Sequence, residues 1–125
     1  MRGASRSAVG KTKFDGEEAM KKDALIDQDQ LAGKLKDLND SALEAWAIAD
    51  GKLHRRYKFP SFSAAFGFMA QTALVCEVMS HHPKWTNVWN VVEIDLLTHR
   101  SKGITTLDFE MAVAMEKIAA VYLKG

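Results

Sequence analysis

The sequence is poor in cysteine and proline and carries almost no net charge. Its 125 residues include one cysteine, Cys76, and two prolines, and the formal net charge is +1. A single cysteine excludes an internal disulfide and fits a reducing compartment, which favours the cytoplasm and leaves the nucleus open. The near-neutral charge gives no reason to expect nucleic acid or an anionic membrane as the main partner. We find no apolar run long enough to cross a bilayer, so we expect no membrane association.

The N-terminal residues differ in composition from the rest of the chain. Residues 1–13 contain four basic and no acidic side chains, which loosely resembles a transit peptide but lacks an apolar face. Such a segment has little capacity to form a core. We therefore interpret residues 1–25 as a polar N-terminal extension and residues 26–125 as one domain, a length that suits a single core.

The hydrophobic patterns follow the order helix, two strands, helix, two strands, helix. The expected segments are a helix from about 28 to 39, strands at 45–48 and 52–59, a helix after 60, two strands within 85–99 and a helix after 105. Asp50-Gly51 is a hairpin signal, and Arg55 interrupts the apolar side of the second strand, which carries Leu53 and Tyr57. Ser61 is a suitable N-cap for the second helix, and Thr105 with Asp108 resembles a capping box at the start of the last helix. This order predicts an α+β domain with a four-stranded antiparallel sheet and three helices packed on one face. The open sheet edges favour a homo-oligomer.

The second predicted helix carries an apolar stripe that continues into a carboxylate. The stripe consists of Phe62, Phe66, Met69, Ala73 and Glu77. Residues at this spacing share one helix face, so we expect the stripe to face the core. Burying an unpaired charge is unfavourable, so Glu77 needs a partner there. We expect Glu77 to be partly buried and to hydrogen-bond His81, which lies one turn further on.

Three of the four histidines, His81, His82 and His99, follow this helix. Histidine is the side chain whose ordinary pKa lets it exchange a proton near neutral pH. Pro83 disfavours helical backbone at His82, so the helix should end near His81. This break could let both adjacent rings face one pocket. With Glu77 upstream, the histidines form a candidate acid–base site.

Two other interpretations of the histidines remain open. His81 and His82 could be a surface pair at a helix end. The three histidines could also hold a zinc ion in a metal-dependent hydrolase, but no fixed motif such as H-E-x-x-H occurs, and we predict no metal site. Trp85 fits either packing against a flat substrate ring or a place in the core.

Several motifs resemble those of the pterin-4a-carbinolamine dehydratase family. They are Ala65-Phe66-Gly67-Phe68-Met69, Glu77 with His81-His82-Pro83, Trp85, Asn87-Val88-Trp89-Asn90, Thr98-His99 and Asp108. The resemblance covers nearly the whole domain and implies a four-stranded antiparallel sheet with three helices, assembled into dimers or tetramers. It also implies a hydro-lyase that dehydrates 4a-hydroxytetrahydrobiopterin to quinonoid dihydrobiopterin, in tetrahydrobiopterin recycling, without a metal or organic cofactor.

The resemblance also implies which residues form the site. The catalytic histidines correspond to His81, His82 and His99. The substrate-contacting residues correspond to Ser80, His81, His82, Leu97, Thr98, His99 and Arg100. The sequence departs from the animal pattern at Leu97, where serine is usual, and at Arg100, where glutamate is usual. Some vertebrate members also bind a homeodomain transcription factor. No residue here indicates that role, and a non-catalytic interaction module on the same fold remains an alternative.

Dehydration needs one proton delivered to the departing 4a hydroxyl and one removed from ring nitrogen five. We assign His81 as the general acid, with Glu77 orienting its ring, and His99 as the base. His82 would hold and orient the pterin. The roles of His81 and His99 could be exchanged, because the sequence does not set the direction of proton flow.

Overall fold

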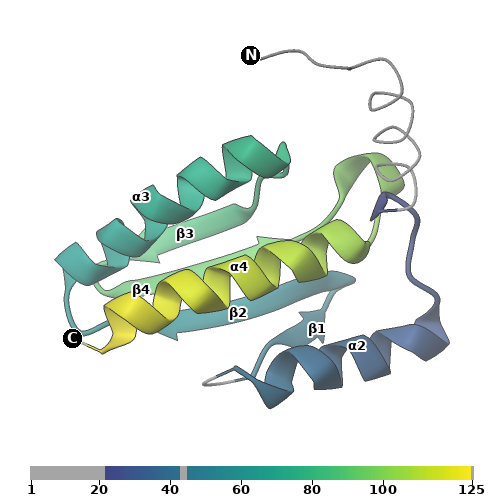
Figure 1. Cartoon of the computed structure of the whole chain (residues 1–125), viewed down its shortest axis with the longest axis horizontal. Helices are drawn as coiled ribbons and strands as arrows, with labels where there is room; N and C mark the ends of the chain where they lie inside the picture. The colour runs from purple at the N-terminus through teal and green to yellow at the C-terminus, as the bar shows by residue number, and fades with distance from the viewer. Residues whose placement is uncertain (1–21, 43–44, 125) are drawn as a thin grey trace, which may run out of the picture.

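The computed structural model describes residues 22–42 and 45–124, and the predicted α+β architecture is confirmed (Figure 1). The elements are α2 (Gln28–Asp40), β1 (Ala47–Ala49), β2 (Lys52–Lys58), α3 (Phe62–Met79), β3 (Lys84–Val88), β4 (Val91–Leu96), the 3₁₀ turn η1 (His99–Ser101) and α4 (Thr106–Leu123). Most of the predicted N-terminal extension, residues 1–21, lies outside the described residues.

The four strands form one antiparallel sheet in the order β1-β2-β4-β3. Figure 1 shows α3 and α4 side by side over the sheet, with α2 next to α4 on the β1 side. Alternate side chains of β2 and β4 are buried, as expected for strands with one face covered. They include Leu53, Tyr57, Val92, Ile94 and Leu96. The core therefore lies between one face of the sheet and the helices.

The β1–β2 hairpin turns at Asp50-Gly51, as predicted. Both residues have positive φ angles, 53° and 72°, which a tight two-residue hairpin turn requires. The first strand begins only at Ala47, because the Asn39 side chain forms hydrogen bonds with both the N–H and the carbonyl of Trp46. Asn39 Oδ1 accepts from the Trp46 N–H at 2.7 Å, and Nδ2 donates to the Trp46 carbonyl at 3.0 Å. Trp46 is thus tied to the end of α2 rather than to a strand.

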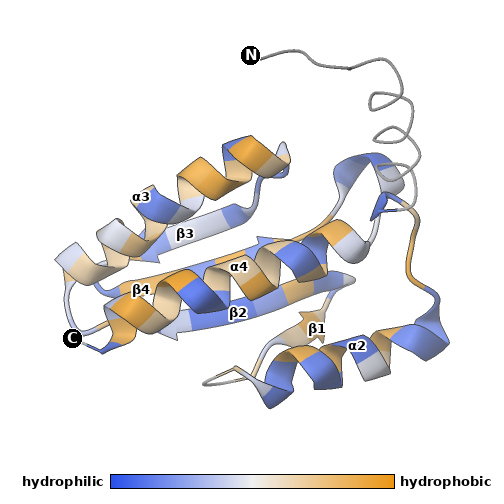
Figure 2. Cartoon of the chain, viewed as in Figure 1, coloured by the Kyte–Doolittle hydropathy of each residue, from blue (hydrophilic) through white to orange (hydrophobic). Residues whose placement is uncertain are grey.

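The prediction of which face of α3 is buried is wrong. The buried residues of this helix are Ala65, Phe68, Thr72 and Cys76. Phe62 and Phe66, from the predicted stripe, are 50% and 57% exposed. Figure 2 shows few hydrophilic residues along α3, so its hydrophobic pattern does not select one side. Three of the four buried residues are small, which lets α3 approach its neighbours closely.

Length and composition alone would let α3 cross a membrane, which corrects the expectation that no apolar run is long enough. The helix has 18 residues, a mean hydropathy of 1.4 and 22% of its residues buried. This length is near the minimum for a membrane span. However, α3 also packs along α4 and over the sheet through its buried side. The absence of a membrane partner therefore stays a prediction.

Arg55, which interrupts the apolar side of β2, is buried and paired. Its Nε donates to Glu116 Oε2 at 3.1 Å, and its guanidinium lies 3.9 Å from the centre of the Tyr57 ring. The same Glu116 oxygen accepts from Trp46 Nε1 at 2.9 Å and from the Tyr57 hydroxyl. Burial and the adjacent Glu116 raise the pKa of Tyr57 above its usual value, so the hydroxyl stays a donor. An ion pair with shared hydrogen bonds thus joins β2 to α4.

Candidate functional site

The three candidate histidines line one hollow between the C-terminus of α3 and η1. Its lining residues are Ser80, His81, His82, Pro83, Lys84, Thr98, His99 and Arg100, and its volume is about 290 Å³. This volume is close to the lower end of the range for small-molecule sites. The hollow therefore suits a single flat ring system better than a large substrate.

The backbone at the end of α3 sends the two adjacent histidines in different directions. Ser80 adopts the left-handed conformation, with φ 52° and ψ 42°. The His81 N–H donates to the Cys76 carbonyl at 3.0 Å, which is typical of a helix that ends in a left-handed residue. His81 turns inward and is 6% exposed. The side chain of His82 is 60% exposed.

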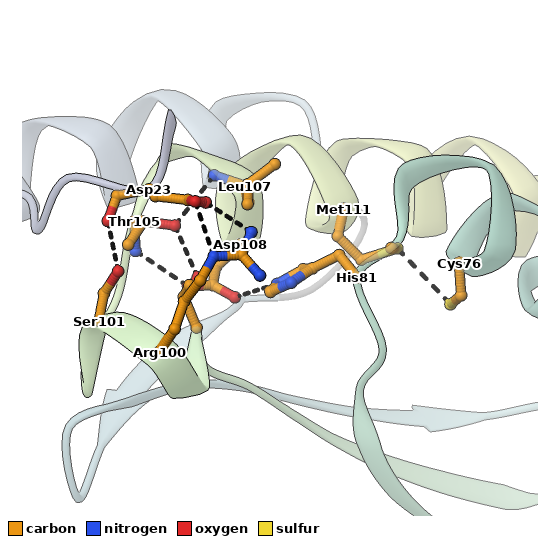
Figure 3. A network of polar contacts seen from close by, with 10 residues as sticks. Asp23, Cys76, His81, Arg100, Ser101, Thr105, Leu107, Asp108 and Met111 are labelled. Atoms are coloured by element: carbon orange, nitrogen blue, oxygen red, sulfur yellow. Dashed lines mark hydrogen bonds and ion pairs between the residues drawn. The ribbon is translucent and has the colours of Figure 1, made fainter. Parts of the chain in front are cut away.

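His81 is held by Asp108, a fully buried carboxylate in the first turn of α4 (Figure 3). Nε2 of His81 lies 2.6 Å from Asp108 Oδ1. The other carboxylate oxygen, Oδ2, accepts from the Thr98 hydroxyl and from the Thr105 backbone N–H, both at 2.9 Å. The carboxylate that caps α4 therefore also anchors the imidazole ring.

Counting protons assigns a donor and an acceptor to each hydrogen bond around Asp108. Thr98 donates its one hydroxyl proton to Asp108, so it must accept in its 2.6 Å contact with Thr105 Oγ1. Thr105 then donates to Thr98 and accepts from the Leu107 N–H at 3.2 Å. In this arrangement Asp108 accepts from the Thr98 hydroxyl and from the Thr105 N–H, and both of its oxygens are used as acceptors. His81 accordingly donates Nε2–H and keeps Nδ1 for a substrate.

The expectation that Glu77 is partly buried beside His81 is wrong. Glu77 Oε2 lies 2.6 Å from Nε2 of His82 instead. The side chains of Glu77 and His82 are 76% and 60% exposed. The physical reason is the left-handed turn at Ser80, which carries His81 toward the core and leaves His82 on the outer side with Glu77.

Sequence reasoning identified the capping box but missed the partner of His81. The box formed by Thr105 and Asp108 is confirmed. The box is a local motif of helix starts, although Asp108 also reaches His81 across 27 positions of sequence. No local pattern signals that contact. The presence of a helix-capping carboxylate and a histidine-rich segment in one small domain could have suggested the contact between Asp108 and His81.

Four other predicted site residues lie at the hollow. Ser80, His99 and Arg100 are exposed, and all three line it. Thr98 lines it too, but this residue is buried and its hydroxyl proton is used by Asp108. The loop after β4 therefore supplies one imidazole, one guanidinium and one supporting hydroxyl.

Two predicted substrate contacts lie elsewhere. Leu97 and Trp85 are half-buried and are not among the residues that line the hollow in the described part of the chain. Trp85 packs against the hydrophobic core, which favours its structural interpretation. The structure adds Pro83 and Lys84 to the lining, and sequence reasoning had not placed either there.

The arrangement is suited to moving protons. A buried imidazole with one nitrogen anchored and one nitrogen free can act as a general acid or base, and a second imidazole borders the same hollow. Within residues 22–42 and 45–124, no group of three histidine, cysteine, aspartate or glutamate side chains is arranged to hold a metal ion.

Comparison with known proteins relates the sequence to one family. The family model described as pterin 4 alpha carbinolamine dehydratase matches residues 24–118. A Solibacter usitatus protein, provisionally named pterin-4-alpha-carbinolamine dehydratase, is 53% identical over 76 residues, covering 61% of this chain and 80% of its own. A protein of Chelativorans sp. with the same provisional name is 48% identical over 82 residues, covering 64% and 84% respectively.

A solved structure agrees with this relationship. The crystal structure of a transcriptional coactivator/pterin dehydratase from Brucella melitensis aligns with a TM-score of 0.69 at 40% identity, covering 76% of this chain and 98% of that one. The residues matched by the family model include the three histidines of the hollow and Asp108. The chain belongs to the pterin 4 alpha carbinolamine dehydratase family.

Proposed function

We propose that this protein is a hydro-lyase that dehydrates 4a-hydroxytetrahydrobiopterin to quinonoid dihydrobiopterin and water. The observation that carries the proposal is the placement of His81, His82 and His99 around one hollow, with His81 anchored to Asp108. Membership of the dehydratase family supports the reaction class. We place the reaction in tetrahydrobiopterin recycling in the cytoplasm.

The proposed reaction consists of two proton transfers. One proton goes to the 4a hydroxyl, which leaves as water with the electrons of its carbon–oxygen bond. The other leaves ring nitrogen five, whose electrons form the new carbon–nitrogen double bond. We assign the first transfer to His81 through Nδ1 and the second to His99, each typically worth ~10²–10⁴-fold in rate. Asp108, rather than Glu77, orients His81 in this proposal.

His82 has a different role in this proposal. Its Nε2 is engaged by Glu77, and both side chains are mostly exposed. Water competes with such a contact, so His82 is less firmly oriented than His81. We assign His82 to holding and orienting the pterin, with its second ring nitrogen available to the substrate.

The direct test is dehydration of a 4a-hydroxytetrahydropterin by the purified protein, followed by the absorbance of the quinonoid product. We expect acceleration without added metal and no change on addition of a chelator. Activity that is lost with chelator and restored by zinc would support the metal-dependent alternative. Binding of a reduced pterin without any acceleration would support the non-catalytic module.

We also propose that the protein forms a homodimer or homotetramer through the exposed side of α3. Phe62, Phe66, Leu74 and Val78 are 50%, 57%, 68% and 88% exposed, and Glu77 is the one charged residue of the helix. An apolar face of this kind can pack against the same face of a second copy. Light scattering at micromolar concentration should show at least a dimer. A transcription-factor partner is suggested only by the resemblance, and no residue of the sequence indicates it.

A further inference from the structure

A short segment before α2 lies against the loop that follows β4. The segment comprises residues 22–26. Ile26 N–H donates to the Ile104 carbonyl at 3.1 Å. Leu25 forms an isolated antiparallel bridge with Thr105. The segment is therefore attached to the second half of the loop through backbone contacts.

Asp23, within this segment, forms a two-pronged ion pair with Arg100 (Figure 3). Arg100 Nε lies 2.6 Å from Asp23 Oδ2, and Nη2 lies 2.8 Å from Oδ1. The Arg100 guanidinium holds the pKa of the Asp23 carboxyl below its usual range, so the pair is charged at neutral pH. Two parallel contacts fix the plane of the guanidinium as well as its position. Arg100 is also one of the residues that line the hollow.

The ion pair leaves one end of the guanidinium available. Nε and Nη2 donate to Asp23, and within the described residues Nη1 has no hydrogen-bond partner. The Arg100 side chain is 62% exposed, so a small molecule can reach it. Arginine donors pair well with oxygen acceptors, and Nη1 carries two N–H groups.

Attachment of the segment does not require the Asp23 carboxylate. The backbone contacts of Leu25 and Ile26 remain without it, and the Ser101 hydroxyl donates to the Asp23 backbone carbonyl rather than to the side chain. The orientation of Arg100, in contrast, depends on that carboxylate. An arginine side chain loses much rotational freedom when it is oriented, and Asp23 imposes this loss before a substrate binds.

We propose that Asp23 is a positioning residue for substrate binding, because it holds Arg100 so that Nη1 donates a hydrogen bond to an oxygen of the pterin in the hollow. This inference rests on the proposed function. The acceptor oxygen belongs either to the ring carbonyl or to a hydroxyl of the substituent on ring carbon six. Both are neutral oxygen acceptors, and a substrate without the hydroxylated substituent separates them.

The experiment compares the wild type with Asp23→Asn, Arg100→Ala and the double variant in steady-state dehydration. We expect each single variant to raise KM about ten-fold and to change kcat less than about two-fold, because uniform binding is lost. The double variant should match Arg100→Ala alone, since Asp23 acts through Arg100. Glu110→Gln is the matched control. It breaks the 3.4 Å contact between Lys22 of the same segment and Glu110 of α4, and it should leave KM unchanged.

A second substrate and a second variant make the result decisive. With a pterin that lacks the hydroxylated substituent, a persisting KM effect of Arg100→Ala assigns the acceptor to the ring carbonyl, and a vanished effect assigns it to the substituent. Arg100→Lys cannot form the two-pronged pair and should also raise KM. Thermal unfolding checks that each variant is folded.

The outcomes distinguish this inference from the function on which it rests. An unchanged KM in Asp23→Asn, or additive effects in the double variant, overturns the positioning role while leaving the dehydratase proposal intact. A wild-type protein that neither binds nor turns over a reduced pterin overturns the proposed function, and the role of Asp23 with it.

Discussion

Two histidine–carboxylate pairs in this protein have the same separation and different surroundings. His81–Asp108 and His82–Glu77 are each joined at 2.6 Å. The side chains of the first pair are 6% and 0% exposed, and those of the second pair are 60% and 76% exposed. Asp108 also accepts from two further donors. Burial and the number of donors, rather than distance, therefore separate an anchored ring from a loosely held one.

Burial changes how much each histidine–carboxylate pair contributes to the free energy of unfolding. Removing one partner of a buried pair leaves an uncompensated polar group and typically destabilises a protein by about 3–5 kcal/mol. An exposed pair exchanges its contact for water and contributes about 0–1 kcal/mol. We therefore expect His81 to keep one orientation while His82 exchanges its carboxylate contact with water.

The strongest way to break the buried pair is Asp108→Asn. An amide has one accepting oxygen, so its NH₂ group must face either His81 or the donors from Thr98 and Thr105. We expect kcat to fall at least about 10²-fold and the free energy of unfolding to fall by about 3 kcal/mol. Steady-state kinetics and urea unfolding measure these changes. Unchanged activity in a folded variant would mean that Asp108 only caps α4.

Removing individual imidazoles tests whether the hollow needs two proton-transfer groups. We expect His81→Ala and His99→Ala each to lower kcat by about ten-fold or more. His54→Ala is the matched control, because His54 pairs with Asp95 at 2.8 Å, with both side chains 33% exposed, and is not among the residues that line the hollow. Its kcat should stay within about two-fold of the wild type. Equal small effects at all three positions would refute the assignment.

A second, partly buried carboxylate, Glu116, tests whether removal from solvent alone accounts for the effect of a carboxylate on activity. Glu116 lies on α4 like Asp108, and it accepts from Trp46, Arg55 and Tyr57. Glu116→Gln leaves Arg55 buried without its counter-charge, so we expect a loss of about 3 kcal/mol in unfolding free energy. We expect kcat to change less than about two-fold, because this cluster does not line the hollow. A large fall in kcat of the folded variant would contradict this separation.

The smallest effect is expected for Glu77→Gln, the counterpart of Asp108→Asn at the exposed pair. The amide oxygen can still accept from His82, and water replaces what is lost. We expect the free energy of unfolding to fall by less than about 1 kcal/mol and kcat to change by less than about two-fold. A ten-fold loss of kcat would restore the orienting role that the sequence first indicated for Glu77.

Local features of the fold were predictable because their signals lie within a few residues. The positive φ angles at Asp50-Gly51 confirm the hairpin turn. The N-cap at Ser61 and the capping box of Thr105 and Asp108 are confirmed as well. Alternation placed Leu53 and Tyr57 on the buried side of β2. In each case the responsible interaction joins residues that are close in the chain.

The errors concern α3 and the residues that follow it. The stripe through Phe62 and Phe66 was a regular helical pattern, yet an adjacent side of the helix, which includes Phe68, is buried instead. A helix with apolar residues on several sides provides no contrast between its faces. The same error misplaced Glu77, since its expected burial depended on that stripe.

By itself the sequence determined the order of elements, the family and the set of imidazoles available for catalysis. Only the tertiary structure decided which carboxylate meets His81 and which one orients Arg100. These contacts join residues 27 and 77 positions apart, so no local period encodes them. The first contact depends on the left-handed turn at Ser80, and the second depends on the attachment of residues 22–26 to the loop before α4. Tertiary packing, rather than the spacing of residues in the sequence, therefore brings each charged side chain to its partner.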